Sequence, residues 1–337
     1  MLRFLFSCII CICINYLSYS QGCCSGGGSN PISGDIATGV LEKYQFDFST
    51  SYQYNTSNII FEGNKQIDED GFYDKLSSDY LFIKTDYGLS NDLTLSLATG
   101  YHIEKALHIK GEDSTNSSSG FGDLILLPRY SIFNSLNNSV RTEITLGLGL
   151  KIPIGSHQDS IEIVPNVWEL LPPTIQLSTG GNDLIIYSSF LKNNNKKKIR
   201  LFVNTLYIKK GYNSLDDKFG DYASLSFYAG KSFLENWSIT AQIKGEWVGK
   251  LSATSEKISA LNLEENYFDK IQWEAKRDAT GGTKIFFSPQ LNYSHNNLTV
   301  YALYEVPIYQ NLNDIQFGSL LQLTFGLNYR FFLKKDS

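Results

Sequence analysis

Residues 140–154 read VRTEITLGLGLKIPI, and this stretch decides the fold. Every second residue from Val140 to Ile154 is apolar or Thr, while the residues between them are charged, Gly, Thr or Pro. Alternation with a period of two is typical of a β-strand whose two faces meet different environments. The stretch is longer than the usual five or six residues of a soluble strand, and it suits a tilted strand that crosses a bilayer in about 9–11 residues.

The same alternation recurs along the chain. In residues 41–54, Tyr44, Phe46 and Phe48 share one face, and Asp47 lies on the other. The expected strands are 41–54, 79–89, 93–103, 120–133, 140–154, 174–190, 199–207, 223–229, 239–247, 285–293, 298–308 and 321–331. The sixth, 174–190, is interrupted by glycines. An even number of antiparallel strands is typical of bacterial membrane barrels. The sequence therefore predicts an all-β, transmembrane, antiparallel up-and-down β-barrel of about twelve strands.

Loop lengths and composition favour a membrane barrel over a soluble one. Short connections alternate with long ones, as periplasmic turns alternate with extracellular loops in outer-membrane barrels. Aromatic residues make up 14% of the chain, enough for interfacial girdles. No apolar run beyond the N-terminus reaches the roughly 18 residues of a membrane helix. The net charge of -5 offers no basic surface for nucleic acid.

Charged residues within the expected strands fall on the face opposite the apolar one. An Arg or Lys facing lipid costs about 2–4 kcal/mol at the midplane, so these residues are expected to line the lumen. Asp183 is the exception, because its parity in the sixth strand assigns it to the lipid face. The expected lumen-lining residues are Lys43, Asp47, Lys84, Asp86, Asp123, Arg129, Arg141, Glu143, Lys151, Lys244, Glu246, Lys284, Glu305 and Arg330. Apolar inward residues such as Tyr80, Phe82 and Phe202 predict contacts for hydrophobic or aromatic solutes.

Two prolines lie within expected strands. Pro128 and Pro289 cannot donate to a ladder, and a closed barrel has no edge strand to accommodate them. The sequence predicts a bulge or wall kink at each. Local accommodation and a lateral opening towards the bilayer are the two structural consequences to be distinguished.

Residues before the barrel divide into a leader and a tail. Residues 1–20 have Arg3, an apolar core and a small-residue end, and they are expected to be a signal peptide cleaved before Gln21. Residues 21–40 form a flexible periplasmic tail rich in Cys and Gly, residues 41–333 the barrel, and residues 334–337 a C-terminal tail. Cys23 and Cys24 could bind a soft metal such as Cu(I), carry a lipid on Cys23 despite a poor lipobox, or be inert or redox-labile.

Several short motifs resemble one outer-membrane family. They are Gly120-Phe121-Gly122-Asp123-Leu124, Lys151-Ile152-Pro153-Ile154-Gly155, Thr280-Gly281-Gly282 followed by Phe287-Ser288-Pro289, Val306-Pro307-Ile308-Tyr309-Gln310-Asn311-Leu312-Asn313, and residues 323–331. Together they resemble the transporters named after the meta-pathway of phenol degradation, which are distantly similar to long-chain fatty-acid transporters. The resemblance implies a twelve-stranded barrel and uptake of hydrophobic molecules. The tail Cys23-Cys24-Ser25-Gly26-Gly27-Gly28 departs from that pattern and resembles tails of Bacteroidetes-type barrels.

Four functions compete on this sequence. The leading hypothesis is a channel or transporter for small solutes in the outer membrane of a Gram-negative cell, with lipid and solute as partners and no cofactor. The alternatives are a copper-handling barrel that uses Cys23 and Cys24, and a structural or adhesive barrel. An embedded hydrolase is not expected: His102 and Glu104 share an inward face, but the chain has no Gly-x-Ser-x-Gly or His-Glu-x-x-His motif.

Overall fold

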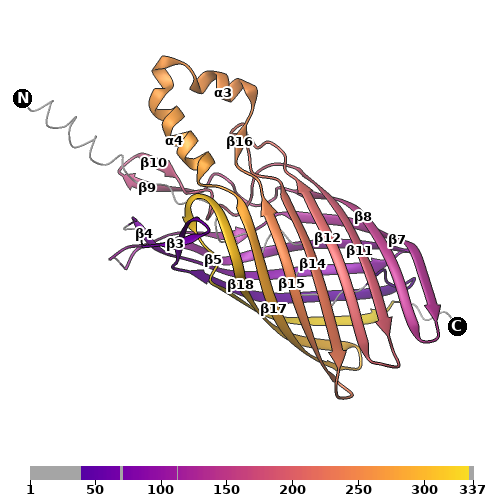
Figure 1. Ribbon diagram of the computed structural model, residues 1–337. Coiled ribbons are helices and arrows are strands. Elements are labelled where there is room, and N and C mark those ends of the chain that lie inside the picture. The colour runs from indigo at the N-terminus through magenta and orange to yellow at the C-terminus, as the bar shows by residue number, and fades with distance from the viewer. Residues whose placement is uncertain (1–38, 69–70, 112, 334–337) are drawn as a thin grey trace, which may run out of the picture.

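Twelve long antiparallel strands form the body of the molecule (Figure 1). The structure is a computed structural model, and it describes residues 39–68, 71–111 and 113–333. The barrel strands are β1 (Gln45–Ser57), β4 (Tyr73–Gly88), β5 (Leu93–Ile109), β7 (Leu124–Asn137), β8 (Val140–Ile152), β11 (Asp183–Asn194), β12 (Ile199–Lys209), β14 (Tyr222–Ser232), β15 (Trp237–Val248), β17 (Gly282–His295), β18 (Leu298–Phe317) and β19 (Leu321–Phe332). The predicted fold class is confirmed.

The sheet closes on itself between its first and last strands. β1 pairs with β4 on one side and with β19 on the other, and both ladders are antiparallel. In the closing ladder Phe48 lies opposite Tyr329 and Thr50 lies opposite Leu327. Closure leaves the backbone groups of the wall paired, which a strand inside a bilayer requires.

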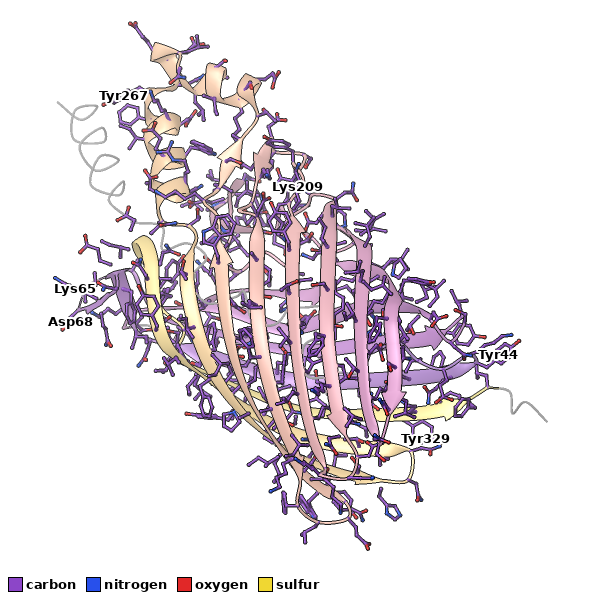
Figure 2. The ribbon with its side chains drawn as sticks, turned by 45° about the vertical axis from the view of Figure 1, so that its right-hand side comes forward. Tyr44, Lys65, Asp68, Lys209, Tyr267 and Tyr329 are labelled. Atoms are coloured by element: carbon purple, nitrogen blue, oxygen red, sulfur yellow. The ribbon has the colours of Figure 1, made fainter. Side chains whose placement is uncertain are left out.

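Short and long connections alternate, and they segregate to opposite ends of the barrel. The hairpin between β17 and β18 turns on Asn296 and Asn297, and Asn296 has a φ of 51°, a conformation that Asn tolerates well. Figure 2 shows Tyr44 and Tyr329 near the end that carries these short turns, and Lys209 and Tyr267 near the end that carries the long loops. We call these the turn end and the loop end.

Burial alternates along the strands as the sequence pattern predicts. In β8, Leu146, Leu148 and Leu150 are exposed, whereas the residues of opposite parity, such as Glu143 and Thr145, are buried. The wall is a single layer, so a buried side chain in a strand points into the barrel and an exposed one points outward. The outer surface therefore carries an apolar band, which includes Leu97, Leu148, Ile186, Leu201, Leu225, Phe227, Ile243, Leu291 and Phe325.

The long loops contain structure of their own. The short strands are β2 (Ile60–Gly63), β3 (Lys65–Ile67), β6 (Thr115–Phe121), β9 (Ser160–Val164), β10 (Val167–Leu170), β13 (Asp217–Lys218) and β16 (Ser252–Ala253). The longest loop forms the helices α3 (Ser255–Leu261), η1 (Glu264–Asn266) and α4 (Tyr267–Asp278), which project beyond the loop end (Figure 1). Among the described residues, none of these helices is long and apolar enough to cross a membrane.

The sixth strand differs from its predicted bounds. β11 begins at Asp183, and residues 174–182 belong to the preceding loop, where Ile175 is fully buried. Asp183 is 1% exposed and points inward, so its assignment to the lipid face was wrong. The prediction treated Gly180 and Gly181 as part of the strand. Because they belong to a loop, the inward and outward alternation does not continue through them to Asp183.

The two prolines leave the strand register unchanged. The β7–β8 ladder omits pairs around Pro128 but keeps its register from Leu126 to Arg129. The bulges lie elsewhere: one falls between Ser131 and Phe133, and another makes Ile308 an extra residue opposite β17. No bulge falls at either proline, and each lies at a local gap in one ladder. The other predicted form, a wall kink at each proline, stays a prediction.

Candidate functional site

Charged side chains of both signs are buried inside the barrel and pair with one another. At the turn end, Asp47 accepts hydrogen bonds from Arg330 Nε at 2.6 Å and from Asn328. Asp47 lies on β1 and its two partners lie on β19, so this group crosses the seam where the barrel closes. Burial of an unpaired charge is costly, which explains why these groups meet.

A short segment before β1 enters the barrel at the turn end. The backbone N–H of Val40 donates to Glu143 Oε1 at 2.7 Å, and that of Leu41 donates to Thr94 Oγ1 at 2.7 Å. Both side chains are buried, and Arg129 donates to the Gly39 carbonyl at 3.5 Å. The described part of the N-terminal region thus occupies the lumen at this end.

Two other groups of charges lie in the lumen, the first beside Asp47 at the turn end and the second nearer the loop end. In the first, Asp86 lies 3.1 Å from Lys84 Nζ and 3.1 Å from Arg129 Nη2. In the second, Lys244 Nζ lies 2.8 Å from Glu246 and 3.0 Å from Glu305. Each group joins two strands that are separated by one other strand, so it ties the wall together on its inner face.

A third group of charges lies at the loop end. Lys151 Nζ lies 2.5 Å from Asp123 and 3.8 Å from Asp183, and Lys210 Nζ lies 2.8 Å from Asp183. The backbones near Asn182 and Gly211 approach so closely that a Cβ on Gly211 would lie 2.3 Å from the Asn182 carbonyl oxygen. Glycine at 211 therefore permits the approach that brings Lys210 to Asp183.

Most of the predicted lumen charges are buried, but Lys43, Arg141 and Arg330 differ; the Arg330 side chain is 33% exposed. Lys43 precedes β1, is exposed and stacks on the Tyr44 ring, so its placement on the inner face of a strand was wrong. The Arg141 side chain is 37% exposed and pairs with Glu143 at the turn end. Lys284 is buried and donates to Ser319 at 2.9 Å.

His102 and Glu104 do not share a face. A bulge in β5 places Asp79 opposite Glu104 and Tyr80 opposite His102, which shifts the parity between the two residues. His102 is buried, Glu104 is exposed, and Lys105 turns inward, where its Nζ donates to the Gln176 carbonyl at 2.7 Å. The sequence carries no local signal for this bulge, so Lys105 was missed.

Apolar side chains fill part of the lumen between the charged groups. The largest cluster consists of Tyr80, Phe82, Ala98, Ile125, Leu127, Ile185, Tyr187, Leu206, Ile208 and Tyr222. Most belong to strands on one side of the barrel. The interior is therefore amphipathic rather than uniformly polar.

Two cavities lie at the two ends of the lumen. The turn-end cavity has a volume of about 560 Å³ and a polar lining that includes Arg200, Thr240 and Asn328. The loop-end cavity has a volume of about 130 Å³ and a lining that includes His102, Lys151 and Lys210. Within the described residues, no group of three or more His, Cys, Asp or Glu side chains could hold a metal ion. Cys23 and Cys24, like the leader and most of the tail, lie outside the described residues.

Aspartates in the loops outside the barrel wall carry shifted pKa values. A hydrogen bond from Arg277 and one from Lys250 hold the pKa of Asp278 below its ordinary value against the opposing effect of burial. Burial raises the pKa of Asp221, but hydrogen bonds from Lys210, Lys218 and Tyr207 lower it by more. Both carboxylates are therefore ionised near neutral pH and anchor the loop bases.

Comparison with solved structures shows which known proteins have a similar fold. An outer-membrane channel from Pseudomonas putida F1 aligns with a TM-score of 0.63 at 12% identity, over 88% of this chain and all of that one. The chain has the fold of an outer-membrane β-barrel. The NanC porin (TM-score 0.41, 11% identity, 84% of this chain and 98% of that one) is a more distant match. The translocator domain of the autotransporter NalP from Neisseria meningitidis is a similarly distant match, with a TM-score of 0.41 and 10% identity over 89% of this chain and 91% of that one. No family model and no curated protein matches the chain.

Proposed function

We propose that the protein is an outer-membrane channel or transporter that passes small solutes between the loop end and the turn end of its barrel. The observation that carries this proposal is a closed barrel with a cavity at each end and an inner surface of paired charges and aromatic rings. The signal peptide and the outer-membrane location belong to the same proposal.

The interior favours slow, selective passage over free diffusion. Barrels of about eight strands are filled by side chains, whereas those of 16–18 strands leave an aqueous channel. A twelve-stranded barrel lies between these sizes, and here buried ion pairs such as Lys244–Glu305 occupy part of the interior. Solutes that offer both polar and apolar contacts suit this lining better than ions do. Uptake of hydrophobic molecules, which the family resemblance implies, is the narrower form of this proposal.

The N-terminal segment is the expected obstruction at the turn end. Val40 and Leu41 are buried there and hydrogen-bonded to Glu143 and Thr94. We expect a barrel that begins at residue 44 to conduct more than one that begins at residue 39, because only the first lacks the segment inside the lumen. The copper-handling alternative gains no support from the comparisons.

Conductance in planar bilayers tests the proposal. Three refolded forms are compared, beginning at residues 21, 39 and 44, and each is checked for heat-modifiable migration on gels. Current steps that grow only in the form beginning at 44 would support a channel restricted by residues 39–43. Silence of all three folded forms, together with no solute uptake into liposomes, would refute the channel or transporter.

A further inference from the structure

The loop-end cavity has an excess of positive charge. The ammonium groups of Lys105, Lys151 and Lys210 lie on its lining, together with the carboxylate of Asp123. Asp183 lies behind the lining, where it pairs with Lys151 and Lys210. With His102 neutral, three positive charges against two negative ones leave a surplus of one. Glu246 accepts a hydrogen bond from Tyr222 of the lining, and it and Glu305 are balanced by two cations, Lys244 at 2.8 Å and Lys284 opposite Glu246 on β17. A buried surplus of one positive charge favours a ligand with one negative charge.

Two buried polar atoms in this cavity lack a hydrogen-bond partner. His102 is 7% exposed, and its Nδ1 has none. Asp123 is also 7% exposed; its Oδ2 pairs with Lys151, but its Oδ1 has no partner. Buried polar atoms are nearly always hydrogen-bonded, so these atoms beside a cavity indicate a place for polar partners. A carboxylate oxygen can only accept, so His102 Nδ1, not Asp123 Oδ1, is the atom that can meet an anionic ligand.

Aromatic rings line the same cavity. The Tyr80 and His102 rings lie 4.4 Å apart between centroids, and Tyr222 and Val248 also lie on the lining. The volume of about 130 Å³ corresponds to on the order of ten water-sized groups. The space therefore suits a small molecule with a flat apolar body rather than an inorganic ion.

We propose that this cavity binds a small monocarboxylate with a flat apolar body, as the recognition site at the entrance of the pore. The ligand carboxylate lies among Lys105, Lys151 and Lys210, and its body lies against Tyr80, His102 and Tyr222. His102 Nδ1 supplies a further polar contact. This inference rests on the proposed transport function, and it names the substrate class.

Benzoate binding to the refolded, detergent-solubilised mature protein tests the inference by calorimetry. Benzyl alcohol serves as the neutral probe of matched shape, and benzylamine, protonated at pH 7, as the cationic one. We expect saturable benzoate binding, with both other probes at least about tenfold weaker, because a hydrogen bond to a charged group is worth enough to produce that ratio. Equal binding of benzyl alcohol, or no saturable benzoate binding, would overturn the inference.

Three variants test whether benzoate binds in this cavity. Lys210→Met should weaken benzoate binding about tenfold or more, because it removes the surplus charge. Lys231→Met, which makes the same change at the turn-end cavity, should leave binding unchanged. His102→Phe keeps the ring and the net charge, and it should weaken binding even if Lys210→Met fails to fold. Equal losses in Lys210→Met and Lys231→Met, or no loss in His102→Phe, would contradict the site.

Binding and conductance separate the two proposals. Current steps without benzoate binding would overturn the carboxylate site and leave the channel intact. Benzoate binding that Lys210→Met abolishes, in a barrel that neither conducts nor transports, would support the site and refute the transport function.

Discussion

The burial of each charged residue inside the barrel depends on a partner of opposite charge. Lys244 lies between Glu246 and Glu305, is 3% exposed, and is stacked on the Phe286 ring with its Nζ 4.7 Å from the ring centroid. Glu305 also accepts a hydrogen bond from Ser288 at 3.0 Å. Lys244 is the cation that both carboxylates share, so its removal leaves them with Lys284, opposite Glu246 on β17, as the nearby cation.

Replacement of this lysine should destabilise the barrel strongly. We expect Lys244→Met to lower the free energy of unfolding by about 3–5 kcal/mol, the range for breaking a buried ion pair from one side. Urea titration of the protein in vesicles, followed by tryptophan fluorescence, measures the change. Lys250→Met is the matched control: its pair with Asp278 is exposed, so its loss should cost only about 0–1 kcal/mol. Similar costs in the two variants would show that the lumen solvates Lys244 as bulk water does.

Among the elements, the helical loop is the least integrated with the barrel. α3, η1 and α4 contain no buried residue, and α3 begins at an N-cap, Thr254, whose side chain accepts from the Lys257 N–H. The loop meets its neighbours mainly through polar contacts: Lys257 Nζ lies 2.8 Å from Asp217, and Trp273 Nε1 donates to the same carboxylate at 2.9 Å. The loop between β10 and β11 differs, because its Ile175 is fully buried among residues of the barrel mouth.

These two loops should respond differently to deletion. Replacement of residues 255–278 by a Gly-Ser linker should leave folding and heat-modifiable migration unchanged, because none of the helical residues is buried. Replacement of residues 171–178 by a similar linker should lower the free energy of unfolding measurably, because Leu171 and Ile175 leave the mouth. Loss of folding in the first variant would contradict the peripheral role of the helices.

At the scale of the whole molecule, the closing seam holds the barrel together. β1 and β19 lie at opposite ends of the described barrel sequence, and their ladder runs from the Gln45–Phe332 pair to the Thr56–Leu321 pair. Phe48 and Tyr329 lie directly opposite each other, where Cβ atoms are about 4.5–5.5 Å apart, whereas diagonal neighbours are about 7–8 Å apart.

Cysteine cross-linking across the seam tests this register. In a Cys23→Ser, Cys24→Ser background, Phe48→Cys with Tyr329→Cys should form a disulfide on oxidation, because opposed residues approach the usual disulfide geometry. Phe48→Cys with Leu327→Cys, one pair out of register, should form it much less. Migration on denaturing gels without reductant reports the cross-link. Equal yields from the two pairs would contradict the register of the closing ladder.

Much of the architecture followed from the sequence because alternation is a local property of each strand. Leu146, Leu148 and Leu150 indicate an outward face wherever their strand lies, and the charges between apolar residues indicate the inward one. Strand ends were less predictable: β5 and β18 run beyond their expected ends at Ile103 and Ile308, because pairing in the loops extends them. The helices of the longest loop were not predicted either, since their sequence is polar and short.

The sequence by itself determined the all-β class, the twelve strands and the side of the wall on which most charges lie. Only the tertiary structure decided which charges meet. Asp183 and Lys210 form a pair because two loop bases approach at Gly211, and Lys105 turns inward because a bulge in β5 shifts the parity. Such contacts depend on residues far apart in the chain, and a one-residue shift in register reverses the direction of every side chain that follows it. For that reason the loop-end cavity emerged only from the folded barrel.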